Sequence, residues 1–370
     1  MIDLHTHTNI SDGTLSPRNL MLYCKRKGID VLAIADHETI DHYDEYKPIA
    51  DMLGIKLIPA IELNVGGIAP KQDCAPELLP YTKMKNFHLI GHGIQDRAKV
   101  EAYFQDIRES NIDVCRQVLV KLQEIYDISF GETLEQAIEN VRAYNHDGVL
   151  DKKAIAKALI AEGYAPDTRR AYDFYIGTKA KAYIPIRKVT AKDVIDVIHD
   201  AGGVVSCAHP STIRYFDQDG NPVKPTRDDY MRLFAGLKEM GLDGVECFTA
   251  VTEFAEEDFF QGVVAKEFDL LVMGGSDFHN HTIGEKLGQP QLTHEMVDAL
   301  EERIAQRQAL NAQKQAEEEA AKKAIVVAPT TDIIPYEDPS KFIETIATSG
   351  ESGSGATGSE TKTKEDNHVQ

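Results

Sequence analysis

The sequence is poor in cysteine, and its few cysteines are not spaced to act together. There are five among 370 residues, without any Cys-x-x-Cys pair, so neither a disulfide framework nor a thiolate zinc site is expected. We expect reduced thiols in a cytoplasmic protein. The cysteines are Cys24, Cys74, Cys115, Cys207 and Cys247.

Long apolar runs are missing as well. No run approaches the roughly 18 residues that are needed to cross a bilayer. The first residues show no basic segment followed by an apolar core, which is the pattern of a secretion signal. We therefore expect neither a membrane protein nor a secreted one.

Positive charge is scarce, except in one segment. The 40 Lys and Arg against 60 Asp and Glu give a formal net charge of -20, which argues against stable binding to duplex nucleic acid or to a membrane surface. Residues 151–190 are the exception, with nine basic side chains against four acidic ones. This basic segment predicts a small anionic partner, whereas nothing in the sequence indicates the oligomeric state.

What the sequence does contain is an alternation of short β-branched runs with helical patterns. Pro17–Lys27, for example, begins with proline and is followed by Gly28, which is typical of a helix. Such alternation predicts a parallel sheet, and seven runs predict a distorted (β/α)7 barrel of the TIM type. The predicted strands are 2–7, 31–37, 56–62, 87–92, 203–209, 244–248 and 270–279.

The alternation is interrupted in the middle of the chain. Amphipathic stretches at 100–126, 133–142 and 152–163 predict a mainly helical insertion that lies over the active site. The last residues are too poor in apolar side chains to pack. The expected parts are a discontinuous barrel of residues 1–94 and 188–292, the insertion 95–187, a C-terminal helix and extension 293–340, and a disordered tail 341–370.

Histidine and carboxylate side chains collect at the ends of the predicted strands. His5 and His7 are two residues apart, so they point to the same side of a strand. The C-terminal strand ends of such a barrel meet in one place. Because these ligand types suit zinc, manganese or iron(II), we predict a multinuclear hydrolytic centre. Its candidate ligands are His5, His7, Asp12, His37, Glu62, His88, His209, Asp277 and His279.

The order of these motifs resembles that of the PHP family (polymerase and histidinol phosphatase). DLHTHT, SDG, ADHET, AIE, HLIG, AHP and GGSDFH follow one another over residues 1 to about 290. Within the family, the chain is similar to the branch of nucleoside 3′,5′-bisphosphate phosphatases and 5′-to-3′ exoribonucleases, which also carry a helical insertion. The resemblance implies a phosphoesterase that acts on a nucleotide or on an oligonucleotide end.

The resemblance also implies three divalent ions, which would be Mn2+, Zn2+, Fe2+ or a mixture of these. Such ions generate hydroxide near neutral pH, and this metal-activated hydroxide would attack phosphorus without a separate catalytic base from the protein. The implied ligand sets are His5, His7, Glu62 and Asp277 for the first ion, Glu62, His88 and His209 for the second, and Asp12, His37 and His279 for the third.

The basic segment departs from the branch that it resembles. That branch carries Arg-Pro-His at the start of an insertion helix, where this chain has Asp151-Lys152-Lys153. Lysine is a mobile point charge whereas arginine is a fixed fork, so anion binding is expected and bisphosphate specificity is left open. The candidate phosphate-binding side chains are Lys152, Lys153, Lys179, Lys181 and Arg214.

Some residues beside the ligands have other expected roles. Asp3 and Asp36 flank ligand histidines, and we expect them to orient an imidazole or to anchor a strand. His92 is a candidate for lining the same cleft as His88, and His42 is expected at the start of a helix.

Three alternative functions stay open. They are an amidohydrolase-like C–N hydrolase on the same centre, a small-molecule phosphatase of the histidinol-phosphate type, and a non-catalytic module stabilised by metal. Amidohydrolases also begin with an HxH pair, but they usually need a metal-bridging lysine at a later strand end. No predicted strand here ends in lysine.

Overall fold

The structure is a computed structural model that describes residues 1–145, 150–187, 189–217, 220–250, 252–280, 286–289 and 291–327. Two compact units divide the chain, Met1–Gln315 and Ala316–Gln370, and all site residues lie in the first. The predicted tail falls outside the described residues, as do residues 328–340. Among the helices that the structure describes, none is long and apolar enough to cross a membrane.

Seven strands form one nearly closed barrel, as the sequence predicts. They follow the order β1-β2-β3-β5-β6-β9-β10, and a bridge between Thr6 and Phe278 joins the first strand to the chain that follows the last. The strands are β1 (Ile2–Thr6), β2 (Val31–Ile34), β3 (Lys56–Asn64), β5 (His88–His92), β6 (Val204–Cys207), β9 (Gly244–Phe248) and β10 (Leu271–Gly274).

One strand departs from the predicted parallel arrangement. β5 is antiparallel to both of its neighbours, β3 and β6, whereas the other paired strands of this sheet are parallel. The prediction of an all-parallel barrel is therefore wrong at β5, because a short apolar run carries no signal of its direction. The reversal places His88, the first residue of β5, opposite Asn64, the last residue of β3.

The helices around the sheet follow from local sequence signals. In α1 (Pro17–Lys27), Ser16 Oγ accepts a hydrogen bond from the Asn19 backbone N–H, and Gly28 ends the helix with a φ of 78°. These are the bounds that the sequence predicts. The other helices of this part are α2 (Tyr43–Leu53), α7 (Ala191–Asp200), α8 (Arg227–Glu239), α9 (Phe254–Phe259), which continues as the π-helical turn η5 (Phe260–Ala265), and α10 (His294–Val327).

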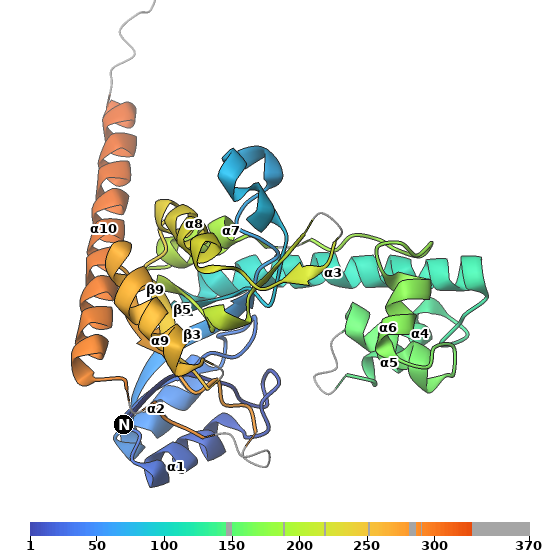
Figure 1. The fold of residues 1–370 in the computed structure, drawn as a ribbon, viewed down its shortest axis with the longest axis horizontal. Coiled ribbons are helices and arrows are strands. Elements are labelled where there is room, and N and C mark those ends of the chain that lie inside the picture. Colours follow the sequence, from blue (N-terminus) through green and yellow to red (C-terminus); the bar gives the residue numbers. More distant parts are fainter. Residues whose placement is uncertain are drawn as a thin grey trace, which may run out of the picture. The chain divides into compact units, whose positions relative to one another are not determined.

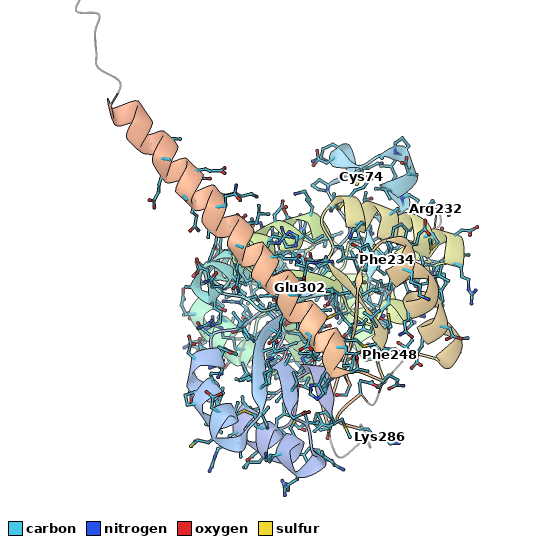
Figure 2. The ribbon with its side chains drawn as sticks, turned by 90° about the vertical axis from the view of Figure 1, so that its left-hand side faces the viewer. Cys74, Arg232, Phe234, Phe248, Lys286 and Glu302 are labelled. Atoms are coloured by element: carbon cyan, nitrogen blue, oxygen red, sulfur yellow. The ribbon has the colours of Figure 1, made fainter. Side chains whose placement is uncertain are left out.

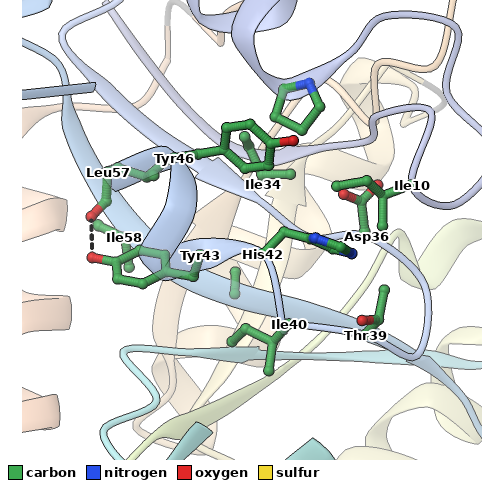
Figure 3. A pocket seen from close by; sticks show the side chains of 12 residues that line it. Ile10, Ile34, Asp36, Thr39, Ile40, His42, Tyr43, Tyr46, Leu57 and Ile58 are labelled. Atoms are coloured by element: carbon green, nitrogen blue, oxygen red, sulfur yellow. Dashed lines mark hydrogen bonds between the residues drawn. The ribbon is translucent and has the colours of Figure 1, made fainter. Parts of the chain in front are cut away.

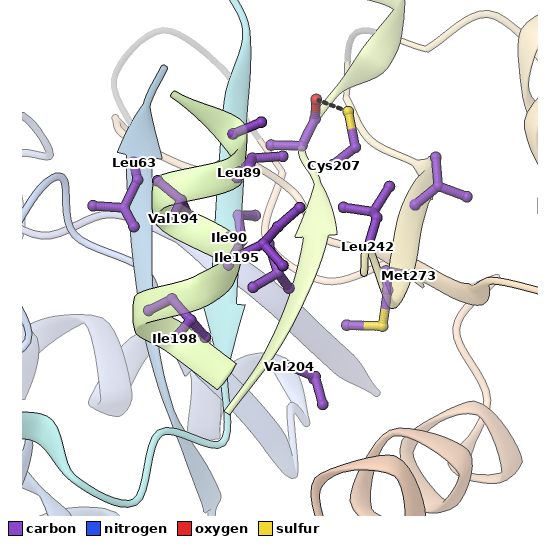
Figure 4. Close-up of a cluster of buried hydrophobic side chains, with 14 of the residues drawn as sticks. Leu63, Leu89, Ile90, Val194, Ile195, Ile198, Val204, Cys207, Leu242 and Met273 are labelled. Atoms are coloured by element: carbon purple, nitrogen blue, oxygen red, sulfur yellow. Dashed lines mark hydrogen bonds between the residues drawn. The ribbon is translucent and has the colours of Figure 1, made fainter. Parts of the chain in front are cut away.

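The barrel core holds the site-bearing strands in place. Ile195 and Ile198 of α7 share a buried cluster with Leu89 and Ile90 of β5 (Figure 4). Further buried aromatic rings in the same cluster come from α8 and β9, at Phe234 and Phe248 (Figure 2). Close packing of this kind fixes the strand ends to within small displacements.

The part of the chain from Cys115 to Ala182, between β5 and β6, builds a second buried core. The helices α4, α5 and α6 gather along one half of α3 (Figure 1), and residues such as Val118, Leu122 and Ile155 form a buried cluster separate from that of the barrel. The helical character of this stretch is as predicted. The helices are α3 (Arg97–Tyr126), α4 (Leu134–Arg142), α5 (Lys152–Ala161) and α6 (Thr168–Ala171), which continues as the π-helical turn η3 (Tyr172–Ile176).

A small three-stranded sheet lies beside the barrel, in the order β4-β7-β8. It joins the loop before β5 to the loop after β6, because Met84 pairs with Tyr215 and Lys85 with Arg214. The short elements of these loops are η1 (Lys71–Asp73), η2 (Pro76–Thr82), β4 (Met84–Lys85), η4 (Pro210–Thr212), β7 (Arg214–Phe216) and β8 (Pro222–Val223).

Candidate metal centre

The nine predicted ligands converge on one end of the barrel. Their nitrogen and oxygen atoms form three groups, and within each group the atoms lie within 4.8 Å of one another. Two groups contain the side chains that the sequence assigns together, and His7 joins the third group in addition. The groups are His5, His7, Glu62 and Asp277; Glu62, His88 and His209; and His7, Asp12, His37 and His279.

Glu62 connects two of these groups through its two carboxylate oxygens. Its Oε1 lies 2.9 Å from His88 Nδ1 and 3.0 Å from His209 Nε2. Its Oε2 lies 3.4 Å from His5 Nε2 and 3.2 Å from His7 Nε2. The carboxylate therefore presents one oxygen to each group, which is the geometry expected of a bridging ligand.

The antiparallel strand β5 explains how His88 joins the centre. His88 was expected at a C-terminal strand end, but it begins its strand. Because β5 runs in the opposite direction, its first residue lies beside the last residues of β3 and β6. His92, at the other end of β5, is fully buried and donates from Nε2 to the Leu4 carbonyl at 2.9 Å. It is a packing residue and does not line the cleft.

The candidate ligands differ in how exposed their side chains are to solvent. The side chains of His5 and His7 are completely buried, whereas Asp12 is 56% exposed. His37 and His279 stand between these extremes, at 27% and 28%. The group that contains Asp12 is therefore the one most open to solvent.

Two ligand residues adopt backbone conformations that are unusual for residues other than glycine. His209 has a φ of 24° and Asp277 a φ of 53°. The Asp277 N–H donates to the His5 carbonyl at 2.9 Å, which ties the two ligand segments together. Strained backbone of this kind persists where the surroundings hold it and is common at functional sites.

Burial and opposite charge together shift the protonation of the centre. Burial opposes protonation of His7, but hydrogen bonds to Asp277 and Glu62 outweigh it and raise the His7 pKa to about 9. Burial lowers the pKa of His37 to about 4. Burial of Asp277 favours its neutral form, but the nearby imidazoles of His5 and His7 outweigh this and hold the pKa of Asp277 well below its usual range. The carboxylates stay ionised, as metal ligands must be.

Glu246 contacts the candidate ligands, although the strand-end pattern does not reveal it. This side chain of β9 is buried, and His5 Nδ1 donates to its Oε1 at 3.0 Å. The His209 backbone N–H donates to its Oε2 at 2.7 Å. Glu246 thus turns His5 Nε2 toward the ligand group and fixes the segment of His209. The available signal was a carboxylate inside the apolar strand GVECF.

Asp36 and Asp3 anchor the backbone, which is one of their two expected roles. Asp36 accepts hydrogen bonds from the Thr8 N–H at 2.7 Å and from Ser11 Oγ at 2.7 Å, and so orders the loop that carries Asp12. Asp3 accepts from the Ser276 N–H at 2.8 Å. Neither residue belongs to a ligand group among the described residues.

An apolar pocket near the centre has a different character. It is lined by Tyr43, Tyr46 and His42, and the Tyr43 hydroxyl donates to the Leu57 carbonyl at 3.0 Å (Figure 3). His42 stands at the N-terminal cap of α2, as expected. The cavity of about 30 Å³ is far smaller than the roughly 300–1000 Å³ of a drug-sized ligand site, so we do not assign the substrate to it.

The five predicted phosphate-binding residues lie in different surroundings. Lys153 is exposed and its charge acts on Glu38, the residue after His37. Lys152 and Lys179 line a large cavity beside the insertion, and Lys181 is exposed outside that lining. Arg214 donates to the backbone carbonyls of Ser211 and Ile213. The five residues are therefore not gathered around one phosphate.

The donor set fits divalent metal ions. Imidazole nitrogens and carboxylate oxygens within 4.8 Å of one another match the ligand preferences of zinc, manganese and iron(II). A carboxylate also holds the outer nitrogen of His5, as is common for metal-bound histidines.

Known proteins share this sequence pattern and this fold. A profile of the PHP domain matches residues 3–175. A 5′-3′ exoribonuclease from Haemophilus influenzae is 28% identical over 284 residues, or 75% of this chain and 89% of that protein. A 3′,5′-nucleoside bisphosphate phosphatase from Chromobacterium violaceum is 22% identical over 309 residues, or 82% and 97%. The solved structure of an amidohydrolase from Chromobacterium violaceum with bound sulfate has a TM-score of 0.55 at 22% identity, covering 82% and 96%.

Proposed function

We propose that this chain, a PHP-domain metal-dependent phosphoesterase, hydrolyses a phosphate ester of a nucleotide or of an oligonucleotide end at a centre of three metal ions. The observation that carries the proposal is the position of Glu62, whose two oxygens face two separate ligand groups. The names of the Haemophilus and Chromobacterium relatives support nucleotide chemistry.

Three divalent ions, Mn2+, Zn2+ or Fe2+, would be held by the three ligand groups. When bound, such ions lower the pKa of water and neutralise charge on a phosphoryl group. The chain's own ligands orient this chemistry, since Glu62 fixes the spacing of two groups and Glu246 fixes the ring of His5. Asp12, His37 and His279 form the exposed side that a substrate meets first.

Positioning of the substrate is the proposed role of the basic side chains. Lys153 is the best placed of these at the rim, because its charge reaches Glu38, next to the ligand His37. Lys152, Lys179, Lys181 and Arg214 remain proposed phosphate contacts. Lysines can follow a phosphate that changes position, at the cost of the fixed geometry of an arginine.

The insertion and the cellular location complete the proposal. We propose that residues 95–187 act as an insertion that lies over the active site, and the separate buried core formed by residues 115–182 supports treating this part as a distinct domain. The five cysteines are free thiols, and four of them are buried. Reduced thiols are typical of cytoplasmic proteins, and we propose that the chain acts in the cytoplasm.

The test is a comparison of phosphate release from three substrates by manganese-loaded protein. Adenosine 3′,5′-bisphosphate, 5′-AMP and a short 5′-phosphorylated RNA would be incubated with the wild type and with Glu267→Gln, an exposed control. We expect turnover of at least one substrate by both proteins. No release of phosphate from any of the three substrates would contradict the proposal, and hydrolysis of an amide substrate by the same protein would then favour the amidohydrolase alternative.

A further inference from the structure

A large cavity lies between the helical insertion and the loop that follows β3. Its volume is about 1080 Å³, and residues of the barrel side, such as Gly67 and Lys83, face residues of the insertion, such as Lys152 and Lys179. Drug-sized ligands occupy sites of roughly 300–1000 Å³, so this space exceeds the needs of one mononucleotide. None of the nine metal ligands lines it.

The lining of the cavity is strongly basic in an acidic chain. Four lysines and one aspartate, Asp173, carry its charge among the described residues, whereas the whole chain has a formal net charge of -20. Lys71 and Lys83 lie outside the basic segment of the sequence, so the fold adds them to Lys152 and Lys179. This gathering of positive charge indicates a ligand with several negative charges.

The chemistry of the lining suits a flexible chain of phosphodiesters. Lysines are mobile point charges and do not require one fixed phosphate geometry. Tyr172 and Tyr183 add aromatic rings to the wall, and Lys152 Nζ lies 4.5 Å from the centre of the Tyr183 ring. Positive grooves with aromatic side chains are typical of single-stranded nucleic acid binding.

Two segments of the cavity wall are close along the chain to metal ligands. Gly66, which lines the cavity, follows Glu62 of β3 by four residues, and four residues of extended chain span roughly 13 Å. Lys83 precedes the ligand His88 by five residues. A Cβ at Gly67 would lie 2.3 Å from the Thr82 carbonyl oxygen, so glycine allows the close approach of the two loops that form this wall.

From these observations we infer that the cavity is a binding site for the downstream part of a single-stranded oligonucleotide whose terminal phosphate is at the metal centre. The inference rests on the proposed function and deepens it, because the site selects an oligonucleotide over a mononucleotide. The terminal phosphate would be held by the centre, and the following phosphodiesters by lysines from both sides of the cavity.

The test measures binding by fluorescence anisotropy with the full-length, manganese-loaded chain. The probes are a labelled phosphorothioate decaribonucleotide with a 5′-phosphate, whose linkages keep their charge and resist cleavage, and the corresponding dinucleotide. The test variant is Lys83→Gln with Lys179→Gln. The control is Lys266→Gln with Lys157→Gln, which removes the same charge from one exposed barrel position and one exposed insertion position outside the cavity.

We expect the test variant to bind the decamer about tenfold more weakly than the control. The slope of log K against the logarithm of the salt concentration should also be shallower by about 1.4, since each phosphate contact contributes about 0.7 to this slope for single strands. Dinucleotide binding should be equal in the two variants. The inference is overturned if the two variants bind the decamer alike, or if the wild type binds the dinucleotide as tightly as the decamer.

Turnover of adenosine 3′,5′-bisphosphate, measured in parallel, separates this inference from the proposed function. Equal decamer binding by the variants with normal bisphosphate turnover would remove the cavity site and leave the phosphoesterase intact. Weaker decamer binding by the test variant than by the control, together with no phosphate release from any of the three substrates named under the proposed function, would support binding in the cavity and refute the proposed function.

Discussion

The metal centre and the basic cavity are built on opposite principles. At the centre, His5, His7 and Glu62 are buried, and Glu62 Oε2 lies 3.4 Å from His5 Nε2 and 3.2 Å from His7 Nε2. At the cavity, Lys71, Lys83 and Lys179 are exposed. If the proposed function holds, the reaction depends on rigid short-range contacts, whereas the choice of substrate depends on mobile charges that tolerate variation.

The largest effect should come from the residue that connects two ligand groups. We expect Glu62→Gln to lower phosphate release by about 10³-fold, because metal-ion stabilisation contributes several kcal/mol and 1.36 kcal/mol corresponds to a factor of ten. The measurement is kcat/KM, together with metal content by mass spectrometry. Retention of three ions and of full activity would show that Glu62 is not a bridge.

A smaller effect is expected one contact further out, at Glu246. Glu246→Leu removes the acceptor for His5 Nδ1 and for the His209 N–H, and loss of such a partner costs about 10–100-fold in metal affinity. Glu246→Gln keeps an acceptor and should lose less. Metal titration by calorimetry separates this positioning role from a structural one, in which both variants would unfold earlier but bind metal normally once folded.

The smallest effect should appear at the exposed rim. Lys153→Gln should raise KM for adenosine 3′,5′-bisphosphate about fivefold and leave kcat unchanged, because a solvent-screened ion pair contributes about 1 kcal/mol or less. Lys157→Gln on the same helix is the matched control. A fall in kcat with an unchanged KM would place Lys153 in the reaction itself and remove the contrast between centre and rim.

The sequence predicts the centre better than the cavity, for physical reasons. His5, His37 and Asp277 stand at or just beyond strand ends, where barrel geometry alone brings side chains together. Glu246 could not be predicted in this way because it lies within a strand. The direction of β5 could not be predicted either, because a short apolar run does not indicate whether a strand is parallel or antiparallel to its neighbours.

The cavity could be predicted only in part. Lys152 and Lys179 stand out in the basic segment of the sequence, whereas Lys71 and Lys83 join them only through the tertiary fold. No local pattern marks those two residues, because their role depends on a loop that is brought close to the insertion. Arg214, by contrast, stands out in the sequence, but its guanidinium donates to nearby backbone carbonyls.

The most direct test of a three-metal centre bridged by Glu62 is anomalous X-ray diffraction from crystals of the manganese-loaded protein at the manganese edge. We expect three anomalous peaks at the barrel end, with the Glu62 carboxylate between two of them and Asp12, His37 and His279 around the third. A single peak, or peaks that Glu62 does not touch, would contradict it.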